Sequence, residues 1–361
     1  MAGLGLAALT APVSAQDIAI AVAGPMTGPV ASIGEQMKRG AETAAAAIND
    51  AGGVDGHKIK IVVEDDACDP KQAVAIANRI VGQQIKYVDG HACSGSSIPA
   101  SDVYADNAIL MMSPASSNPV LTEKGHSTIM RIYPRDDRQG DFIGPWIAEK
   151  YKGKKIAILH DKSAYGKGLA QVVKDRLNAA GVTEVMFEGI NPGEKDYSAV
   201  ITKLKNAGAE FVYFGGYHTE AGLMLRQAAD QSYKLNLMTG DSIATSEFWQ
   251  ISGPAGEGTL FTFPTDPRRS PNAVKALEQF KGQGFDPEGF TLFSYGVVQA
   301  IADGIKRANS DDPKAIAKAL EDGKPVETVM GPVRFDKKGD VLDPSYDINQ
   351  WSAGKYAPIA K

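Results

Sequence analysis

The segment Gly90 to Asp102, GHACSGSSIPASD, gathers side chains that could do chemistry. It holds Cys93, one of the two cysteines of this 361-residue chain, and directly after it the hydroxyls of Ser94, Ser96 and Ser97. It contains no lysine or arginine to bind a phosphate group and no obvious base to activate a serine. The glycine that opens a GxSxG nucleophile elbow is also missing. The segment therefore favours binding through hydroxyl groups over nucleophilic catalysis.

Signatures of enzymes and cofactor sites are missing elsewhere in the sequence as well. Pro25 and Pro29 interrupt the glycine-containing segment after the first apolar run, so a dinucleotide-binding GxGxxG is absent, and no GxxxxGK[ST] exists. The five histidines lack HExxH spacing, and neither cysteine belongs to a CxxC pair. We therefore predict that the protein is not an enzyme and uses no cofactor and no metal ion.

The N-terminus indicates export. Val13-Ser14-Ala15 has the small-x-small form of a signal-peptidase site and follows a short apolar stretch, Leu4 to Leu9. An alternating strand pattern begins directly after this site, at Asp17. We predict that residues 1–15 are the remnant of an export signal and that the mature protein lies in the periplasm. The alternative is an alanine-rich N-terminus of a cytosolic protein.

Charge and cysteine content restrict the partners and the compartment. A net charge of −5 and the lack of any basic run argue against nucleic acid or an anionic membrane as the partner. No apolar run reaches the length needed to span a bilayer, so no membrane insertion is expected. An even number of cysteines in an exported protein suggests a disulfide between Cys68 and Cys93, with two free buried thiols as the alternative.

Apolar strand-like segments alternate with amphipathic helical ones. The predicted strands are Ile18–Ala23, Ile59–Glu64, Tyr87–Gly90, Leu110–Ser113, Ile156–His160, Glu184–Glu188, Phe211–Gly215 and Leu235–Thr239. The predicted helices between them are Ser32–Asp50, Pro70–Val81, Gln139–Tyr151, Gly168–Ala180, Tyr197–Asn206 and Glu220–Gln231. Ala-Gly pairs end three of these helices, where glycine supplies a left-handed cap. The alternation predicts an α/β fold with parallel sheets and helices on both faces.

The second half of the chain reads like a copy of the first, which predicts two Rossmann-like lobes. Proline-containing breaks at Arg131–Asp137, Phe261–Pro271 and Val341–Asp347 predict three hinge crossovers between them. One lobe would comprise residues 16–135 plus 265–344, and the other residues 136–264 plus 345–361. Ordinary proline-rich surface loops are the alternative explanation of these breaks.

Ligands of open α/β sheets bind beyond the carboxyl ends of the strands. In the first lobe, Ser94 precedes a helix that we expect to begin near Ile98 or Pro99, and such a helix start binds an anion such as a carboxylate. Ser113, Ser116 and Ser117 end the neighbouring strand and would add donors. These serines would serve as N-caps in the alternative interpretation.

The second lobe offers a partner for a positive charge. Asp241 ends a strand in a small, polar surround, and Tyr165 and Tyr217 flank it. A carboxylate there would meet an ammonium group, although Asp241 could instead cap a helix at Ser242–Trp249. Carboxylate donors on one lobe and an acid on the other describe a clamp for an α-amino acid.

Five segments carry a family resemblance: DDACDPKQAVAIANRIV, GHACSGSSIPASDVY, HDKSAYGKGLA, EFVYFGGYHTEAGLMLRQA and TVMGPVRFDKKGD. They closely resemble the leucine/isoleucine/valine-binding proteins, the periplasmic receptors of branched-chain amino-acid ABC importers, which have the type I periplasmic-binding fold. The likeness runs from Asp17 almost to the C-terminus. It implies a monomer that delivers an amino acid to an inner-membrane ABC permease.

The resemblance also implies roles for single residues. Cys68 and Cys93 match a disulfide pair. Ser94 and Ser117 match positions that bind the ligand carboxylate, Ser117 also the amine, and Ala115 matches a backbone carbonyl that accepts from the amine. Asp241 stands where many members place a Glu for the amine, and Tyr165 and Tyr217 match residues that close over the ligand.

Departures from the family pattern concern the side-chain pocket, which Phe290 also lines. Ile33 stands where relatives often have Tyr or Trp, and Ala92 where they often have Leu or Phe. Asp241 is one methylene shorter than Glu. These changes predict a range beyond leucine, isoleucine and valine that includes phenylalanine. The alternatives are a receptor for another amino acid, such as γ-aminobutyrate, and a ligand-sensing regulator.

Overall fold

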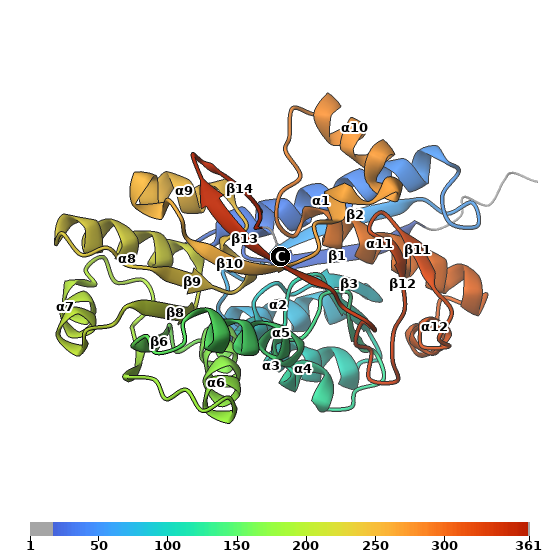
Figure 1. Ribbon diagram of the computed structural model, residues 1–361. Coiled ribbons are helices and arrows are strands. Elements are labelled where there is room, and N and C mark those ends of the chain that lie inside the picture. Colours follow the sequence, from blue (N-terminus) through green and yellow to red (C-terminus); the bar gives the residue numbers. More distant parts are fainter. Residues whose placement is uncertain (1–16, 360–361) are drawn as a thin grey trace, which may run out of the picture.

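The computed structural model describes residues 17–359, so the predicted signal remnant, residues 1–15, lies outside the described residues. The molecule contains a five-stranded sheet, a seven-stranded sheet and a two-stranded hairpin. Figure 1 shows the five-stranded sheet and its helices on the right and the seven-stranded sheet and its helices on the left.

The first sheet is parallel throughout, in the order β2-β1-β3-β4-β5. Its strands are β1 (Ile18–Gly24), β2 (Ile59–Asp65), β3 (Tyr87–Gly90), β4 (Leu110–Ser113) and β5 (Ile129–Arg131). The helices of this lobe are α1 (Ala31–Asp50), α2 (Pro70–Gly82), α3 (Ser94–Asp106), α4 (Val120–Glu123), α10 (Val274–Gly282), α11 (Thr291–Ala308) and α12 (Pro313–Leu320). The hairpin β11 (Val326–Thr328) and β12 (Gly331–Val333) follows α12.

Both faces of the first sheet are buried, as expected for parallel strands covered by helices. In β1, Ile20 and Val22 belong to the core that contains Met37 of α1. Ala21 and Ala23, on the opposite face, belong to the core that contains Ile76 of α2. The alternation of side chains along one strand therefore supplies two separate cores.

The second sheet has the order β14-β13-β10-β9-β8-β6-β7. Its strands are β6 (Ile156–His160), β7 (Met186–Gly189), β8 (Phe211–Gly215), β9 (Leu237–Thr239), β10 (Leu260–Pro264), β13 (Tyr346–Ser352) and β14 (Lys355–Pro358). Its helices are α5 (Asp136–Lys150), α6 (Ala164–Ala179), α7 (Ser198–Ala207), α8 (His218–Asp230) and α9 (Ser246–Ser252). Strands β13 and β14 pair antiparallel, so this sheet is mixed rather than purely parallel as predicted.

The chain passes between the two sheets three times, which confirms the predicted crossovers. It leaves the first lobe after β5 and returns to it after β10, where α11 and α12 pack on β3 and β4. It leaves this lobe again before β13. Pro134, Pro267 and Pro344 lie in these three connections, where the missing N–H of proline removes no strand hydrogen bond.

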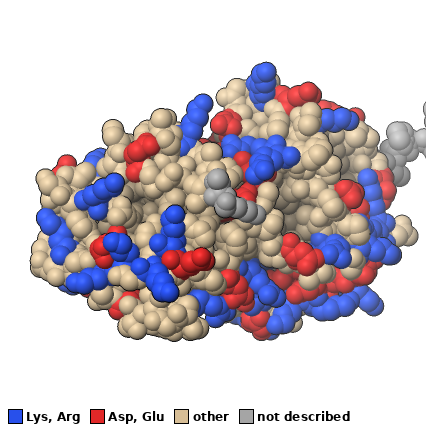
Figure 2. Space-filling view, viewed as in Figure 1, with Lys and Arg blue, Asp and Glu red and all other residues tan. Residues whose placement is uncertain are grey.

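The described chain also contains four short 3₁₀ segments. Two follow strand β9 or helix α9, and two lie in the connection after β10: η1 (Asp241–Ile243), η2 (Gly253–Gly256), η3 (Pro267–Arg269) and η4 (Pro271–Ala273). On the face shown in Figure 2, positive and negative side chains are interspersed. Ion pairs of the described chain include that of Lys338 with Glu123, at 2.8 Å.

Among the predicted boundaries that differ from the structure, two helix starts lie four residues too late for a local physical reason. Helix α3 begins at Ser94 rather than near Ile98, because the carbonyl of Cys93 accepts from the N–H groups of Ser96 and Ser97 and closes the first turn. Helix α6 begins at Ala164 rather than Gly168, because the Ser163 hydroxyl caps it by accepting from the N–H of Gly166 at 2.8 Å.

Close packing of α1 on α11 depends on a glycine. A Cβ atom at Gly40 would lie 2.1 Å from the Thr291 carbonyl oxygen. We predict that Gly40→Ala lowers the free energy of unfolding by about 1–3 kcal/mol, because the helices must separate. Chemical denaturation measures this loss, and Gly82→Ala, where no atom lies within 4 Å, is the matched control. Equal stability of both variants would contradict the packing argument.

Candidate functional site

A cavity lies where the carboxyl ends of both sheets face each other. Eight of the ten predicted binding residues line it: Ile33, Ala92, Ser94, Ala115, Tyr165, Tyr217, Asp241 and Phe290. Cys93 and Ser242 complete the lining, and the sequence analysis did not predict Ser242. First-lobe residues come from α1 and from the segments after β3, after β4 and before α11. Second-lobe residues come from α6 and from the segments after β8 and β9.

The first-lobe end of the cavity offers hydrogen-bond donors. Ser94 is the first residue of α3, whose 13 residues direct the positive end of the helix dipole toward the cavity, and no acidic residue lies in its first turn. The Ser94 hydroxyl oxygen accepts from the Asn118 backbone N–H at 3.2 Å. Its hydrogen is therefore directed away from Asn118 and is available to an anion.

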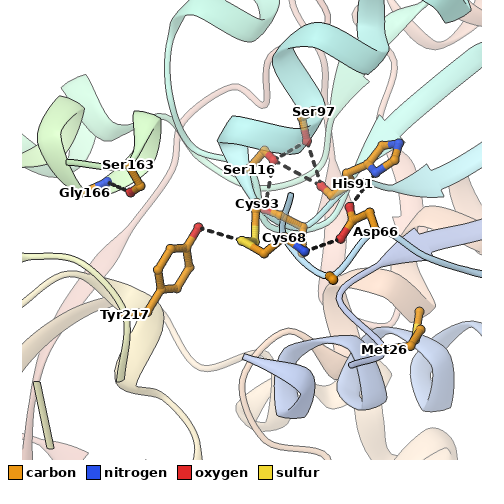
Figure 3. The surroundings of a disulfide bond; sticks show 12 residues. Met26, Asp66, Cys68, His91, Cys93, Ser97, Ser116, Ser163, Gly166 and Tyr217 are labelled. Carbon is orange, nitrogen blue, oxygen red and sulfur yellow. Dashed lines mark hydrogen bonds and ion pairs between the residues drawn. A yellow bond between two sulfur atoms is a disulfide. The ribbon is translucent and has the colours of Figure 1, made fainter. Parts of the chain in front are cut away.

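Ser116 and Ser117 do not line the cavity, unlike the prediction. The hydroxyl of Ser116 shares a hydrogen bond with that of Ser97 (2.5 Å) and lies 2.9 Å from the Ala92 carbonyl oxygen (Figure 3). The Ser117 carbonyl accepts from the Asp136 N–H at the start of α5, at 2.8 Å. Both serines are buried and hold the loop that carries the lining residues.

The two cysteines form a disulfide, which confirms the predicted pair. Because Cys93 lines the cavity next to Ser94, the bond joins the start of α3 to the loop after β2. The Tyr217 hydroxyl of the second lobe contacts the Cys68 sulfur at 3.7 Å (Figure 3). The disulfide therefore positions the Ser94 loop and also receives a residue of the opposite lobe.

A chain of buried hydrogen bonds through Asp66, His91 and Tyr104 lies next to the disulfide. His91 Nδ1 lies 2.6 Å from an Asp66 carboxylate oxygen, and its Nε2 lies 2.9 Å from the Tyr104 hydroxyl. The other Asp66 oxygen accepts from the Cys68 N–H at 2.8 Å. His91, Asp66 and Tyr104 are fully buried, so this histidine has a structural environment with both ring nitrogens partnered.

Asp241 is the acid of the second-lobe end. Its carboxylate accepts from the Tyr165 hydroxyl at 2.7 Å and from the Tyr133 hydroxyl at 2.8 Å. Burial raises the pKa of Asp241 to about 6, while the bonds from both phenols oppose this shift. Asp241 lies in η1 and does not cap a helix, because Thr245 is the N-cap of α9.

Besides Ser242, two residues that contact the lining of the cavity were not predicted from the sequence, Tyr133 and Asn118. Tyr133 lies in the predicted first crossover, and its aromatic side chain beside Pro134 was the only signal. Asn118 lies in the serine-rich segment after β4, and its side-chain N–H donates to the Ala164 carbonyl of α6 at 2.7 Å. Asn118 follows β4 of the first sheet, and Ala164 follows β6 of the second sheet. This bond therefore joins the two lobes.

Other hydrogen bonds between the lobes surround the cavity. The Thr219 hydroxyl donates to the Pro29 carbonyl at 2.7 Å, and the Glu288 carboxylate accepts from the Ser246 N–H at 2.9 Å. Together with the Asn118 bond, these contacts hold the two lobes against each other. The structure therefore has a closed arrangement of the lobes around the cavity.

Within residues 17–359, no helix combines the length and apolar character needed to cross a bilayer. The same described part of the chain contains no group of three or more His, Cys, Asp or Glu side chains arranged to hold a metal ion.

Sequence comparison shows that the chain belongs to the periplasmic binding protein family, whose model matches residues 17–355. Leu/Ile/Val-binding protein homolog 1 of Brucella suis is 46% identical over 338 residues, which cover 94% of this chain and 91% of that protein. An amino acid binding protein of Pseudomonas aeruginosa is 47% identical over 344 residues, covering 94% of this chain and 92% of that protein. The predicted family is therefore confirmed.

The fold agrees with solved structures. The branched-chain amino acid transporter substrate binding protein LivJ of Streptococcus pneumoniae, solved in complex with isoleucine, matches with a TM-score of 0.85. The sequence identity is 25%, and the match covers 94% of this chain and 97% of that chain. The predicted two-lobed α/β fold is thus that of a periplasmic binding protein.

We predict that the Cys68→Ser, Cys93→Ser double variant loses about 3–4 kcal/mol of unfolding free energy, because a loop of 25 residues is no longer closed. Denaturant titration of the purified variant beside the oxidised parent measures the loss. Reduction of the parent protein should give the same result without any substitution. Unchanged stability in both experiments would show that the disulfide does not constrain the unfolded chain.

Proposed function

We propose that the protein is a periplasmic receptor that captures an amino acid in the cavity and delivers it to an inner-membrane ABC permease. The ligand class is the branched-chain amino acids leucine, isoleucine and valine, with a range that extends to phenylalanine. One observation carries the proposal: the cavity places the donor groups of Ser94 and α3 opposite the carboxylate of Asp241. Such opposite ends suit the carboxylate and ammonium groups of one zwitterion.

The apolar wall supports an apolar ligand side chain. Ile33, Ala92 and Phe290 line the cavity and carry no hydrogen-bonding group in their side chains. Burying a leucine-sized side chain against such a wall contributes about 1.5–3 kcal/mol. Ala92 contributes only a methyl group to this wall, and this small side chain supports the wider range.

Relatives support the transport role. The similar proteins include Leu/Ile/Val-binding protein homologs and a transporter substrate binding protein solved with isoleucine. We propose that the mature chain acts as a monomer whose lobes comprise residues 16–135 plus 265–344 and residues 136–264 plus 345–361. Rotation about the three crossovers would open the cavity, and ligand bound to both lobes would favour the closed form.

A second candidate ligand is γ-aminobutyrate, and the hydrogen bonds of Asp241 support this candidate. Asp241 is held toward Tyr133 and Tyr165 by two hydrogen bonds. An ammonium group placed farther from its carboxylate than in an α-amino acid would reach such a withdrawn acid. Titration with both leucine and γ-aminobutyrate separates the two candidates.

We predict that Ser94→Ala and Asp241→Ala each weaken leucine binding by about 2–4 kcal/mol, because each removes one partner of a buried, charged hydrogen bond. Isothermal titration calorimetry on ligand-stripped protein measures both losses. Ser101→Ala, on the same helix but bonded to the Ile98 carbonyl, is the matched control and should bind as the parent does. Parent-like affinity in both test variants would exclude these residues from the site.

The bond between Asn118 and Ala164 generates a separate kinetic prediction. Asn118→Asp keeps the oxygen that accepts from the Val120 N–H at 2.9 Å but removes the donor that reaches Ala164. Losing one hydrogen bond of about 1 kcal/mol in the closed form should raise the leucine dissociation rate about fivefold. Stopped-flow fluorescence measures this rate.

Asn107→Asp serves as the control for the charge change, because the Asn107 side chain bonds only within its own lobe, to the Val103 carbonyl. It should dissociate leucine at the parent rate. An equal rate in the two Asp variants would show that the Asn118 bond does not stabilise the closed form.

A further inference from the structure

Tyr133 links the first crossover to the acid of the cavity. It lies between β5 and α5, is 1% exposed, and donates its hydroxyl hydrogen to Asp241 Oδ2 at 2.8 Å. The other carboxylate oxygen accepts from Tyr165 at 2.7 Å. Asp241 is therefore held from two directions, by its own lobe through Tyr165 and by the hinge through Tyr133.

Aromatic packing fixes the direction of the Tyr133 hydroxyl. The Tyr133 ring centroid lies 4.9 Å from that of Phe293, 5.3 Å from that of Phe290 and 6.3 Å from that of Phe263. Phe290 lines the cavity. A ring enclosed by three others has little rotational freedom, so its hydroxyl remains directed at Asp241.

Within residues 17–359, the titratable groups that interact electrostatically with Asp241 are phenols and one carboxyl group, and none is a cation. They are Tyr133 of the crossover, Asp136 at the start of α5, Tyr165 of α6, Tyr213 of β8, Tyr217 before α8 and Tyr346 of β13. Arg131, the buried cation of this region, pairs with Asp340 at 2.7 Å. Burial raises the pKa of Tyr133 well above its ordinary value, so its phenol stays a donor.

We propose that Tyr133 is a positioning residue for the ligand ammonium group: its hydroxyl keeps the Asp241 carboxylate ionised and in a fixed position at the cavity. This inference rests on the proposed function, in which Asp241 receives the ammonium group. Removing the hydroxyl leaves a buried carboxylate with one phenol donor instead of two. A carboxylate with fewer donors takes up a proton at higher pH and then no longer attracts a cation.

The test is calorimetric titration of L-leucine into the parent protein and Tyr133→Phe from pH 5 to pH 8. The parent should lose affinity as the pH falls through about 6, because Asp241 becomes neutral there. In Tyr133→Phe, the midpoint of this loss should rise by about one pH unit, so affinity should fall only about twofold at pH 7 but about tenfold at pH 5. Leucine keeps both of its own charges across this range.

Two further variants isolate the effect. Tyr346→Phe removes a buried hydroxyl that donates to the Arg135 carbonyl at 3.1 Å, and it should leave the pH midpoint unchanged. Asp241→Asn removes the titrating group, so adding Tyr133→Phe to it should change affinity less than twofold. Burial likewise raises the pKa of Asp161 to about 6. The comparison in the Asp241→Asn background also excludes Asp161 as the source of the pH dependence.

Three results would overturn the inference. They are a Tyr133→Phe midpoint equal to that of the parent, a loss of affinity that is equal at every pH, and a tenfold loss at pH 5 that persists in the Asp241→Asn background. Carboxyl NMR titration of ligand-free parent and Tyr133→Phe protein measures the pKa of Asp241 without any ligand. If the parent binds no amino acid, the proposed function fails, while an unshifted Asp241 pKa in Tyr133→Phe separately overturns the role of Tyr133.

Discussion

A buried carboxylate without a neighbouring cation is the feature on which the site depends. Removing a charged group from water costs several kcal/mol unless other groups replace its solvation. Around Asp241 this replacement comes from two phenol hydroxyls and is incomplete, since burial still raises the pKa of the acid. An ammonium group in the cavity would supply the missing positive charge. Closure of the lobes would then favour a cationic ligand group over an empty cavity or a neutral one.

The Ser94 end of the cavity presents hydrogen-bond donors at fixed positions. Here most of the serine hydroxyls hold the loop together. Ser97, Ser113 and Ser116 all approach the His91 carbonyl, and Arg131 donates to the Ser116 and Asn118 carbonyls beneath. This leaves Ser94 and the helix start to face the cavity. Rigid support of a few exposed donors reduces the ordering that a ligand must impose.

The three crossovers do more than connect the lobes. The first crossover contains Tyr133, which donates a hydrogen bond to Asp241. The Tyr133 ring also packs against Phe290 of the cavity wall. The hinge therefore contacts both the polar and the apolar part of the site. Under the proposed function, a hinge in such contact would respond to the ligand directly, and binding and lobe rotation would be coupled over a few ångströms.

Sequence alone determined the α/β class, the three crossovers, the cysteine pair and eight lining residues of the cavity. These features follow from local periodicity, glycine and proline positions, or long family motifs, each of which is contained in a short stretch of chain. Only the tertiary structure decided that Ser116 and Ser117 are buried without lining the cavity, that β13 and β14 run antiparallel, and that Tyr133 meets Asp241. Tyr133 and Asp241 are 108 positions apart. Their contact depends on how two sheets and a hinge pack together, and no local pattern records that packing.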